Sequence, residues 1–163
     1  MVPFMMLLAA QAAPAACTSE AHDAFDFWVG DWSVSVASSR QTVAKSRIEK
    51  LYNGCAVREN WMPANGNEGG SLNSLGSDGR WHQRWVGSSG ETVDFTGGLN
   101  DKGEMVLTGW WAGYAGPGND RLVRMTYTKR DDGSVRQHGE ISTDHGTSWS
   151  TGFDFVYSPA EAE

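Results

Sequence analysis

Hydrophobic and polar residues alternate along most of the chain after Asp31, and this alternation predicts β-strands. In one such run, Trp32, Val34 and Val36 occupy every second position, with polar residues between them. Successive side chains of a strand point to opposite faces, so a period of two is typical of strands with one buried face. No stretch after Ala24 has the periodicity of an ordinary helix. The pattern therefore predicts an all-β fold.

Turn signals separate these runs at hairpin spacing, which favours antiparallel strands joined in sequence order. They are Asn53-Gly54, Asp78-Gly79, Ser89-Gly90, Lys102-Gly103 and Asp132-Gly133. We expect roughly eight to ten strands in an antiparallel up-and-down barrel, because closure removes exposed sheet edges. Two longer Gly-rich segments, Pro63–Gly70 and Ala112–Asp120, are expected as loops at a barrel mouth. They act either as lids or as plain connections.

Composition and charge narrow the class of protein. The 163 residues are 39% hydrophobic and 20% charged, and this length and composition fit one soluble domain with a substantial core. The 20 Gly and 8 Trp fit tight turns between strands that carry large flat side chains. A formal charge of −7 argues against nucleic acid or an anionic membrane surface as the partner.

The first residues have the features of an export signal. They are uncharged and apolar and end in Ala13-Pro14-Ala15, which resembles a signal-peptidase site. The stretch is too short for a permanent transmembrane anchor. We divide the chain into a signal peptide (1–15), a leader (16–24), a barrel domain (25–159) and a tail (160–163). The mature protein is then periplasmic or secreted, and the alternative is a lipoprotein with lipid on Cys17.

Export changes how the two cysteines are interpreted. In an oxidising compartment an even number of cysteines favours a disulfide, which here joins Cys17 to Cys55. The alternative is a pair of buried free thiols. Two cysteines alone cannot hold a structural zinc ion, and the chain has no C-x-x-C motif for redox chemistry.

Several distinctive motifs are spread over nearly the whole mature chain, and the most distinctive of them is F-D-F-W-x-G-x-W. They are residues 25–32, Ile48-Glu49, Gly54-Cys55, Glu59-x-Trp61, W-H-Q-x-W-V at 81–86, Gly97-Gly98, D-G-S-V-R-Q at 132–137 and S-T-D-H-G-T-S-W at 142–149. Together these motifs resemble those of a bacterial lipocalin-like (calycin-type) β-barrel family whose activity is unassigned. The resemblance implies a barrel whose first strand is preceded by a short helical turn and whose Trp32 closes the floor.

Residues 142–149 also fit the Asp-box pattern S-x-D-x-G-x-[TS]-W, which is known from sialidase propellers. A glycosidase is one interpretation of this motif. The structural interpretation is a hairpin in which Asp144 caps turn amides, Gly146 takes a positive φ and Trp149 packs beneath. One box cannot build a propeller, so we favour the structural interpretation.

Three polar residues share a strand face with bulky apolar neighbours, which suggests polar groups inside the barrel. Glu59 lies between Val57 and Trp61, and Gln83 and Gln137 have similar neighbours. A buried carboxyl group must be protonated or find donors, and Arg121 is a candidate partner, with Arg124 the alternative in a shifted register. We expect a pocket for a small hydrophobic or amphipathic molecule, or else a network that only satisfies itself. The candidate ligand-binding residues are Glu59, Trp61, Trp81, Gln83, Trp85, Arg121 and Gln137.

The histidines do not indicate a metal or cofactor. His82 and His138 lie on outward faces in this pattern, and no H-E-x-x-H or His-x-His spacing is present. We therefore expect neither metal nor cofactor, with haem bound through one His as an alternative. The leading hypothesis is an exported small-molecule-binding barrel with no assigned activity. The alternatives are an isomerase or hydrolase that uses Glu59 as acid/base, and a structural or protein-binding envelope module. Oligomeric state and ligand identity stay open.

Overall fold

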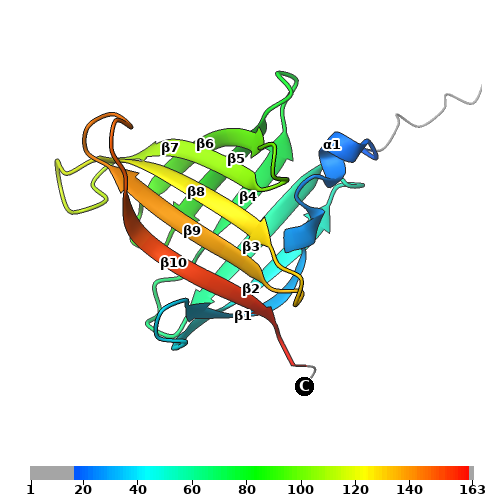
Figure 1. Cartoon of the computed structure of the whole chain (residues 1–163), viewed down its shortest axis with the longest axis horizontal. Coiled ribbons are helices and arrows are strands. Elements are labelled where there is room, and N and C mark those ends of the chain that lie inside the picture. The colour runs from blue at the N-terminus through cyan, green and yellow to red at the C-terminus, as the bar shows by residue number, and fades with distance from the viewer. Residues whose placement is uncertain (1–16, 162–163) are drawn as a thin grey trace, which may run out of the picture.

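Ten antiparallel strands form a closed barrel in the computed structural model, which describes residues 17–161 (Figure 1). Each strand pairs with its neighbours in the sequence, and β1 also pairs with β10 to close the sheet. The strands are β1 (Gly30–Val36), β2 (Thr42–Leu51), β3 (Ala56–Pro63), β4 (Gly69–Leu75), β5 (Trp81–Gly87), β6 (Thr92–Leu99), β7 (Met105–Trp111), β8 (Arg121–Lys129), β9 (Val135–Ser142) and β10 (Ser150–Pro159). The predicted all-β up-and-down barrel is confirmed.

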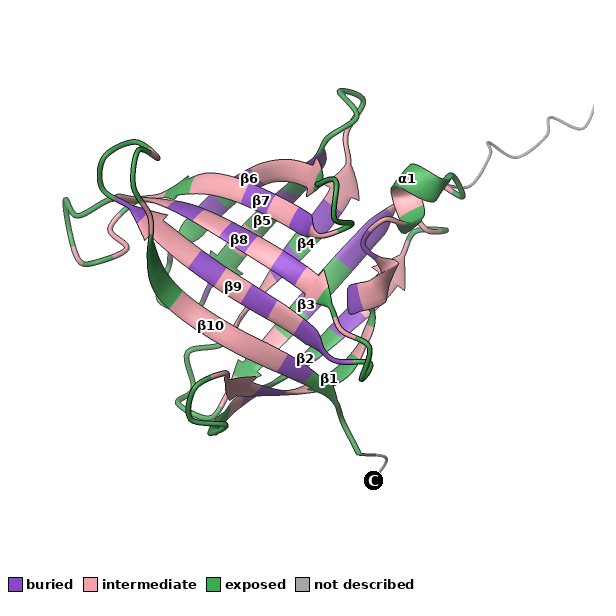
Figure 2. Ribbon diagram, in the orientation of Figure 1, coloured by how far each residue is buried: buried purple, intermediate pink, exposed green. Residues whose placement is uncertain are grey.

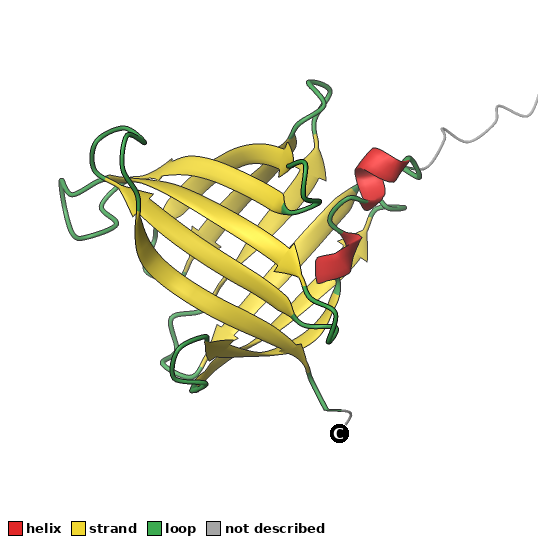
Figure 3. Ribbon diagram, in the orientation of Figure 1, coloured by secondary structure: helices red, strands yellow, loops and turns green. Residues whose placement is uncertain are grey.

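Two short helical turns precede the barrel, where the resemblance implied one. They are α1 (Glu20–Asp23) and the 3-10 turn η1 (Asp26–Trp28), and Figure 3 shows both at one end of the molecule. Because β1 runs away from η1, the up-and-down order fixes the end at which every later loop lies. The loops 112–120 and 143–149 lie at the opposite end, together with 64–68. We call the helical end the floor and the opposite end the mouth.

The floor is plugged by aromatic side chains from η1 and its flanks. Phe25 and Trp28 are fully buried and stack with ring centroids 4.8 Å apart. Phe25 also meets Trp81 and Tyr127 edge-on, at 5.7 and 5.0 Å. The indole N–H of Trp32 donates to the Trp28 carbonyl oxygen at 2.8 Å, which ties the turn to β1. This end of the barrel therefore contains packed core rather than free volume.

Burial alternates along the strands as the sequence pattern predicts (Figure 2). On β7 the buried pair is Met105 and Leu107, while Trp110 faces outward with 49% of its surface exposed. The register of β10 against β9 shifts between Thr151 and Phe153. A bulge of this kind re-aims the side chains that follow it. Beyond it, Phe153 faces the barrel interior.

A disulfide joins Cys17 to Cys55, which confirms that prediction. It fastens the start of the described chain to the turn between β2 and β3. The ammonium group of Lys50 adds ion pairs to Asp23 and Asp26, at 2.5 and 2.6 Å. The sulfur of Cys17 is used in this bond and is not free to carry lipid. The predicted signal peptide at 1–15 lies outside the described residues.

The hairpin between β9 and β10 is held by its own side chains. Asp144 Oδ1 accepts a hydrogen bond from the Ser148 amide at 2.8 Å, and Gly146 has a φ of +86°. The indole of Trp149 donates to the Gly146 carbonyl at 3.0 Å. Hydrogen bonds lower the pKa of Asp144 to about 2, and the largest contribution comes from the Ser148 hydroxyl. The carboxylate of Asp144 is thus engaged in the turn itself.

The loop predicted at Pro63–Gly70 is shorter than expected, whereas the one predicted at Ala112–Asp120 has the expected bounds. Gly69 and Gly70 belong to β4, so the loop covers only 64–68. Gly69 pairs with Trp61 on one side and Gly87 on the other, and a Cβ atom there would lie 2.6 Å from the ring of Trp85. Glycine in this strand therefore makes room for an aromatic ring rather than forming a turn.

Candidate ligand-binding cavity

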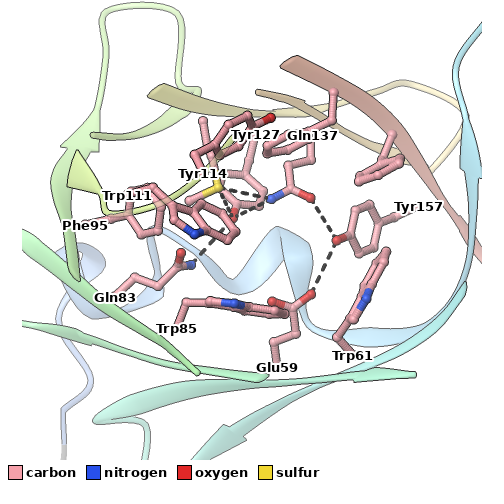
Figure 4. Close-up of a pocket in the computed structure, with 13 residues that line it drawn as sticks. Glu59, Trp61, Gln83, Trp85, Phe95, Trp111, Tyr114, Tyr127, Gln137 and Tyr157 are labelled. Atoms are coloured by element: carbon pink, nitrogen blue, oxygen red, sulfur yellow. Dashed lines mark hydrogen bonds between the residues drawn. The ribbon is translucent and has the colours of Figure 1, made fainter. Parts of the chain in front are cut away.

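A cavity of about 270 Å³ lies inside the barrel, above the aromatic plug. Its lining comes from β3, from β5 to β10 and from the loop between β7 and β8 (Figure 4). The lining residues are Glu59, Trp61, Gln83, Trp85, Phe95, Trp111, Tyr114, Met125, Tyr127, Gln137, Phe153, Phe155 and Tyr157. Most are aromatic, which gives the cavity flat apolar walls.

The upper walls of the cavity are aromatic side chains that lie toward the mouth of the barrel. Phe153 and Phe155 stack at 5.4 Å, and Phe155 contacts Trp61 at 5.8 Å. Across the barrel, Trp111 meets Tyr114 edge-on at 5.4 Å. These rings are only half-buried, unlike the plug below them. They present apolar surface to whatever fills the cavity.

Gly139 of β9 creates space for one of these rings. Its position faces inward, and a Cβ atom built there would lie 2.2 Å from the ring of Phe153. Any larger residue at Gly139 would therefore push Phe153 toward the cavity. The size of the cavity thus depends on the absence of a side chain at this position.

A closed ring of buried polar side chains runs around the lower part of the cavity. Neighbouring members are joined by hydrogen bonds of 2.7 to 3.5 Å. In order, the members of this polar ring are Glu59, Ser71, Asn73, Gln83, Tyr127, Gln137 and Tyr157. Buried polar groups are costly unless they are paired, and here each member finds a partner within the barrel.

Glu59 carries the one carboxyl group of the polar ring. Its oxygens accept hydrogen bonds from Ser46, Ser71 and Tyr157 at 3.2 to 3.3 Å. Burial raises the pKa of Glu59 to about 7, because the loss of water penalises the ionised form more than the three hydroxyl donors stabilise it. Glu59 therefore changes its ionisation near neutral pH, which few carboxyl groups do.

The ionisation of Glu59 sets the direction of the hydrogen bonds next to it. The Tyr157 hydroxyl lies 3.3 Å from Oε1 of Glu59 and 2.9 Å from Oε1 of Gln137. A hydroxyl has only one proton to donate. When Glu59 is ionised, its carboxylate accepts the one hydrogen bond that the Tyr157 hydroxyl can donate. When Glu59 is protonated, its carboxyl group can donate to Tyr157, and Tyr157 then donates to Gln137.

One donor in the cavity walls has no acceptor among the described residues. The indole N–H of Trp85 is buried and makes no hydrogen bond to the described residues. Trp85 lies level with Glu59, because Ser71 pairs with Glu59 on one side and Trp85 on the other. An unpaired buried donor marks a position that a ligand or water acceptor would satisfy.

Five of the seven predicted site residues line the cavity, and two do not. Glu59, Trp61, Gln83, Trp85 and Gln137 lie together, as the shared strand faces suggested. Among the residues that the sequence did not single out, Tyr127 and Tyr157 complete the polar ring and Trp111 and Phe155 extend the walls. All four lie in runs of alternating residues, but the alternation alone does not show which face of each strand points inward.

Trp81 and Arg121 need correction. Trp81 is in the plug: it packs against Phe25, and its indole N–H donates to the Ala21 carbonyl at 3.2 Å. Arg121 begins β8 at the mouth and donates to the Asp120 carbonyl at 2.8 Å, so it does not pair with Glu59. The alternative partner, Arg124, is on the outer face and pairs with Glu140 at 2.9 Å. Hydroxyl groups take the place of the expected arginine.

The two strand histidines lie outside the cavity lining. His82 hydrogen-bonds to Asp78 at 3.0 Å, and His138 to Thr151 at 3.0 Å. Within residues 17–161, no three or more His, Cys, Asp and Glu side chains gather where they could hold a metal ion. In the same part of the chain, no helix is long and apolar enough to cross a membrane.

The fold and the cavity are consistent with one class of protein, whereas comparison of the sequence with known proteins identifies no family. A closed antiparallel barrel with a short N-terminal helix and an internal cavity is consistent with a lipocalin-like fold. No protein-family model matches the chain. No curated protein matches it either.

Proposed function

We propose that this chain is an exported, lipocalin-like (calycin-type) barrel protein that binds one small hydrophobic or amphipathic molecule. The observation that carries the proposal is the aromatic-walled cavity above a polar ring. Ligand sites are typically concave and mostly apolar, with a few convergent polar groups that fix orientation. An apolar cavity of about 150 Å³ holds benzene. A cavity of about 270 Å³ therefore suits a ligand with one or two rings.

Export rests on the signal-like residues 1–15 and is supported by the Cys17–Cys55 disulfide, since disulfides persist in oxidising compartments. In this proposal residues 1–15 are removed, 16–24 remain as a leader, 25–159 form the binding domain and 160–163 are a tail. The mature protein is periplasmic or secreted. No metal or other cofactor enters the proposal.

Native mass spectrometry of the protein recovered from the cell envelope tests this function. We expect a fraction of the protein to carry a small-molecule adduct, and the denatured intact mass to lack residues 1–15. Trp111→Ala should weaken retention of the adduct by about tenfold or more, because Trp111 is a wall of the cavity. Trp110→Ala is the matched control, since that adjacent indole faces solvent and its loss should leave retention unchanged.

Two results would contradict the proposal. One is protein that is always recovered without adduct and does not respond to a screen of small apolar probes by tryptophan fluorescence. The other is equal loss of adduct in the Trp110→Ala and Trp111→Ala variants, which would place binding outside the cavity.

One observation favours a second candidate function, an isomerase or hydrolase on the same barrel. A pKa of about 7 suits a general acid/base, because such a group gives and takes protons near neutral pH. Glu59 would be that group, with the ligand held against it by the walls. Conversion of the recovered ligand by wild-type protein but not by Glu59→Gln would support catalysis: a hydrolase changes the mass of the ligand, and an isomerase changes its chromatographic retention at constant mass. A ligand that keeps both its mass and its retention time with both proteins leaves binding as the function.

A further inference from the structure

The cavity contains an acidic group and no basic one. Glu59 lies between Trp85 and Trp61 in the close-up (Figure 4), and only 5% of the surface of the residue is exposed. Among the described residues that line the cavity there is no Lys, Arg or His. The other polar groups are amides and phenols. A ligand carboxylate would therefore meet a like charge with no cation to compensate it.

The three donors that face Glu59 are neutral. Ser46, Ser71 and Tyr157 supply hydroxyl hydrogen bonds of 3.2 to 3.3 Å. Hydroxyls alone leave an ionised carboxylate short of stabilisation, and a cation in contact would supply it. The neighbouring walls suit a cation as well, because the face of an indole or phenol ring attracts ammonium groups. Trp61 and Tyr157, 6.4 Å apart between ring centroids, offer such faces close to Glu59.

We propose that the ligand is a small organic amine, bound as its ammonium ion with Glu59 as counter-ion and the aromatic rings as walls. This inference rests on the proposed binding function and names its ligand class. The amine nitrogen lies at the carboxylate of Glu59, where it supplies the positive charge that the hydroxyl donors lack. The apolar part of the amine extends toward Trp111 and Phe155. Fatty acids and other carboxylates are excluded by the same charge.

Glu59 is the group that makes binding depend on pH. The other titratable groups near it are Tyr127 of β8 and Tyr157 of β10, and burial raises the pKa of both hydroxyls well above the ordinary value, so they stay neutral. At the mouth, Arg121 lies near Tyr114 of the loop between β7 and β8. An alkylammonium ion, like the side chain of Lys, has a pKa of about 10 and stays protonated near pH 7.

Three probes with one phenylalkyl skeleton test the inference: 2-phenylethylamine, 3-phenylpropionate and propylbenzene. At pH 8 we expect calorimetry to give an affinity for the amine at least tenfold higher than for the carboxylate. With a pKa of about 7 for Glu59, the ionised fraction falls from about nine tenths at pH 8 to about one tenth at pH 6. Amine affinity should therefore fall about tenfold between these pH values, while propylbenzene affinity stays constant.

Two variants test whether the preference for the amine depends on the charge of Glu59 rather than on the shape of its side chain. Glu59→Gln keeps the size of the side chain, and it should remove both the preference for the amine and its pH dependence while propylbenzene still binds. Asp94→Asn is the matched control, since Asp94 faces outward and pairs with Arg84 at 2.5 Å. It should leave all three affinities unchanged. The wild-type pH series needs no variant, so the inference stays testable if Glu59→Gln folds poorly.

The outcomes distinguish the inference from the function beneath it. Equal or tighter binding of 3-phenylpropionate, or amine affinity that is the same at pH 6 and pH 8, would overturn the amine ligand while the binding function stands. Binding of propylbenzene alone would do the same and point to a neutral ligand. Binding of none of the three probes, together with no adduct on the recovered protein, would count against the binding function itself.

Discussion

The Glu59→Gln variant is expected to be more stable than the wild-type protein at pH 8, by about 3 kcal/mol in the free energy of unfolding. The reason is the cost of a buried charge. In the folded protein burial raises the pKa of Glu59 from 4.5 to about 7. A difference of about 2.5 pKa units corresponds to about 3 kcal/mol, at roughly 1.4 kcal/mol per unit. Gln has no charge to bury and avoids this cost.

The sign of the pH dependence follows from which state holds the proton more tightly. Because its pKa is raised on folding, Glu59 is protonated in the folded state at pH values where it is ionised in the unfolded chain. Its contribution to stability is therefore complete below about pH 4.5, declines as the pH rises toward 7, and is lost above that. In Glu59→Gln this decline should be absent.

Other carboxyl groups change the free energy of unfolding with pH in the opposite direction, and they do so at lower pH. The pKa of Asp154 is lowered mainly by a hydrogen bond from Arg136, and the pKa of Asp144 is lowered mainly by hydrogen bonds from Ser148. Their contributions are present above the unfolded pKa and are lost as the pH falls through the folded value. The wild-type protein should thus lose stability at both acidic and neutral pH, whereas the variant loses it only at acidic pH.

Urea unfolding at a series of pH values from 4 to 9 measures this difference. The control is Asp94→Asn, which should keep the wild-type slope between pH 4.5 and 7 because Asp94 is on the surface. If Glu59→Gln is less stable than wild type at pH 8, the polar ring exists to hold the fold rather than to present a carboxyl group. Greater stability with lost amine binding identifies Glu59 as a group kept for function at a cost in stability.

The sequence predicted the faces of the strands because a period-two pattern carries that information directly. Glu59, Gln83 and Gln137 were identified for this reason: each interrupts a row of bulky apolar residues on one face. The same rule places Trp81 and Trp85 on one face of β5, and both do point inward. A strand pattern therefore predicts which way a side chain points, including polar side chains.

Position along the barrel axis is what a strand pattern does not contain. Trp81 and Trp85 share a face, yet the first belongs to the plug and the second to the cavity. The boundary between them depends on how far Phe25 and Trp28 enter the barrel, and those residues come from another part of the chain. Arg121 has the phase of the inward residues of β8 but begins the strand, at the mouth.

The local sequence pattern also does not predict which side chains of other strands form hydrogen bonds with a buried residue. Glu59 was expected to pair with an arginine because a lone buried charge is costly. Its donors are instead Ser46, Ser71 and Tyr157, from three different strands. Nothing in the sequence near Ser46 or Ser71 marks them as donors to a carboxyl group. The raised pKa of Glu59 is therefore a property of the folded barrel rather than of any segment.

Reduction of the Cys17–Cys55 disulfide is expected to lower the free energy of unfolding by about 4 kcal/mol. The bond joins residues 38 positions apart in the sequence. In the chain-entropy model a loop of this length restricts the unfolded chain by about that amount. The folded protein keeps other attachments at the same place, because Lys50 pairs with Asp23 and Asp26. We therefore expect the reduced protein to stay folded at room temperature with a lower melting temperature.

The chain has only these two cysteines, so a reducing agent acts on this bond alone. Denaturant unfolding with and without dithiothreitol measures the change, and a Cys17→Ser, Cys55→Ser double variant should match the reduced protein and no longer respond to the reagent. The cavity lining begins at Glu59 and includes neither cysteine, so probe affinity at room temperature should be unchanged on reduction. An unchanged unfolding midpoint would mean that the bond does not restrict the unfolded chain by the amount expected for a loop of this length. A collapse of probe affinity would mean that the plug supports the cavity from below and that the disulfide keeps it in place.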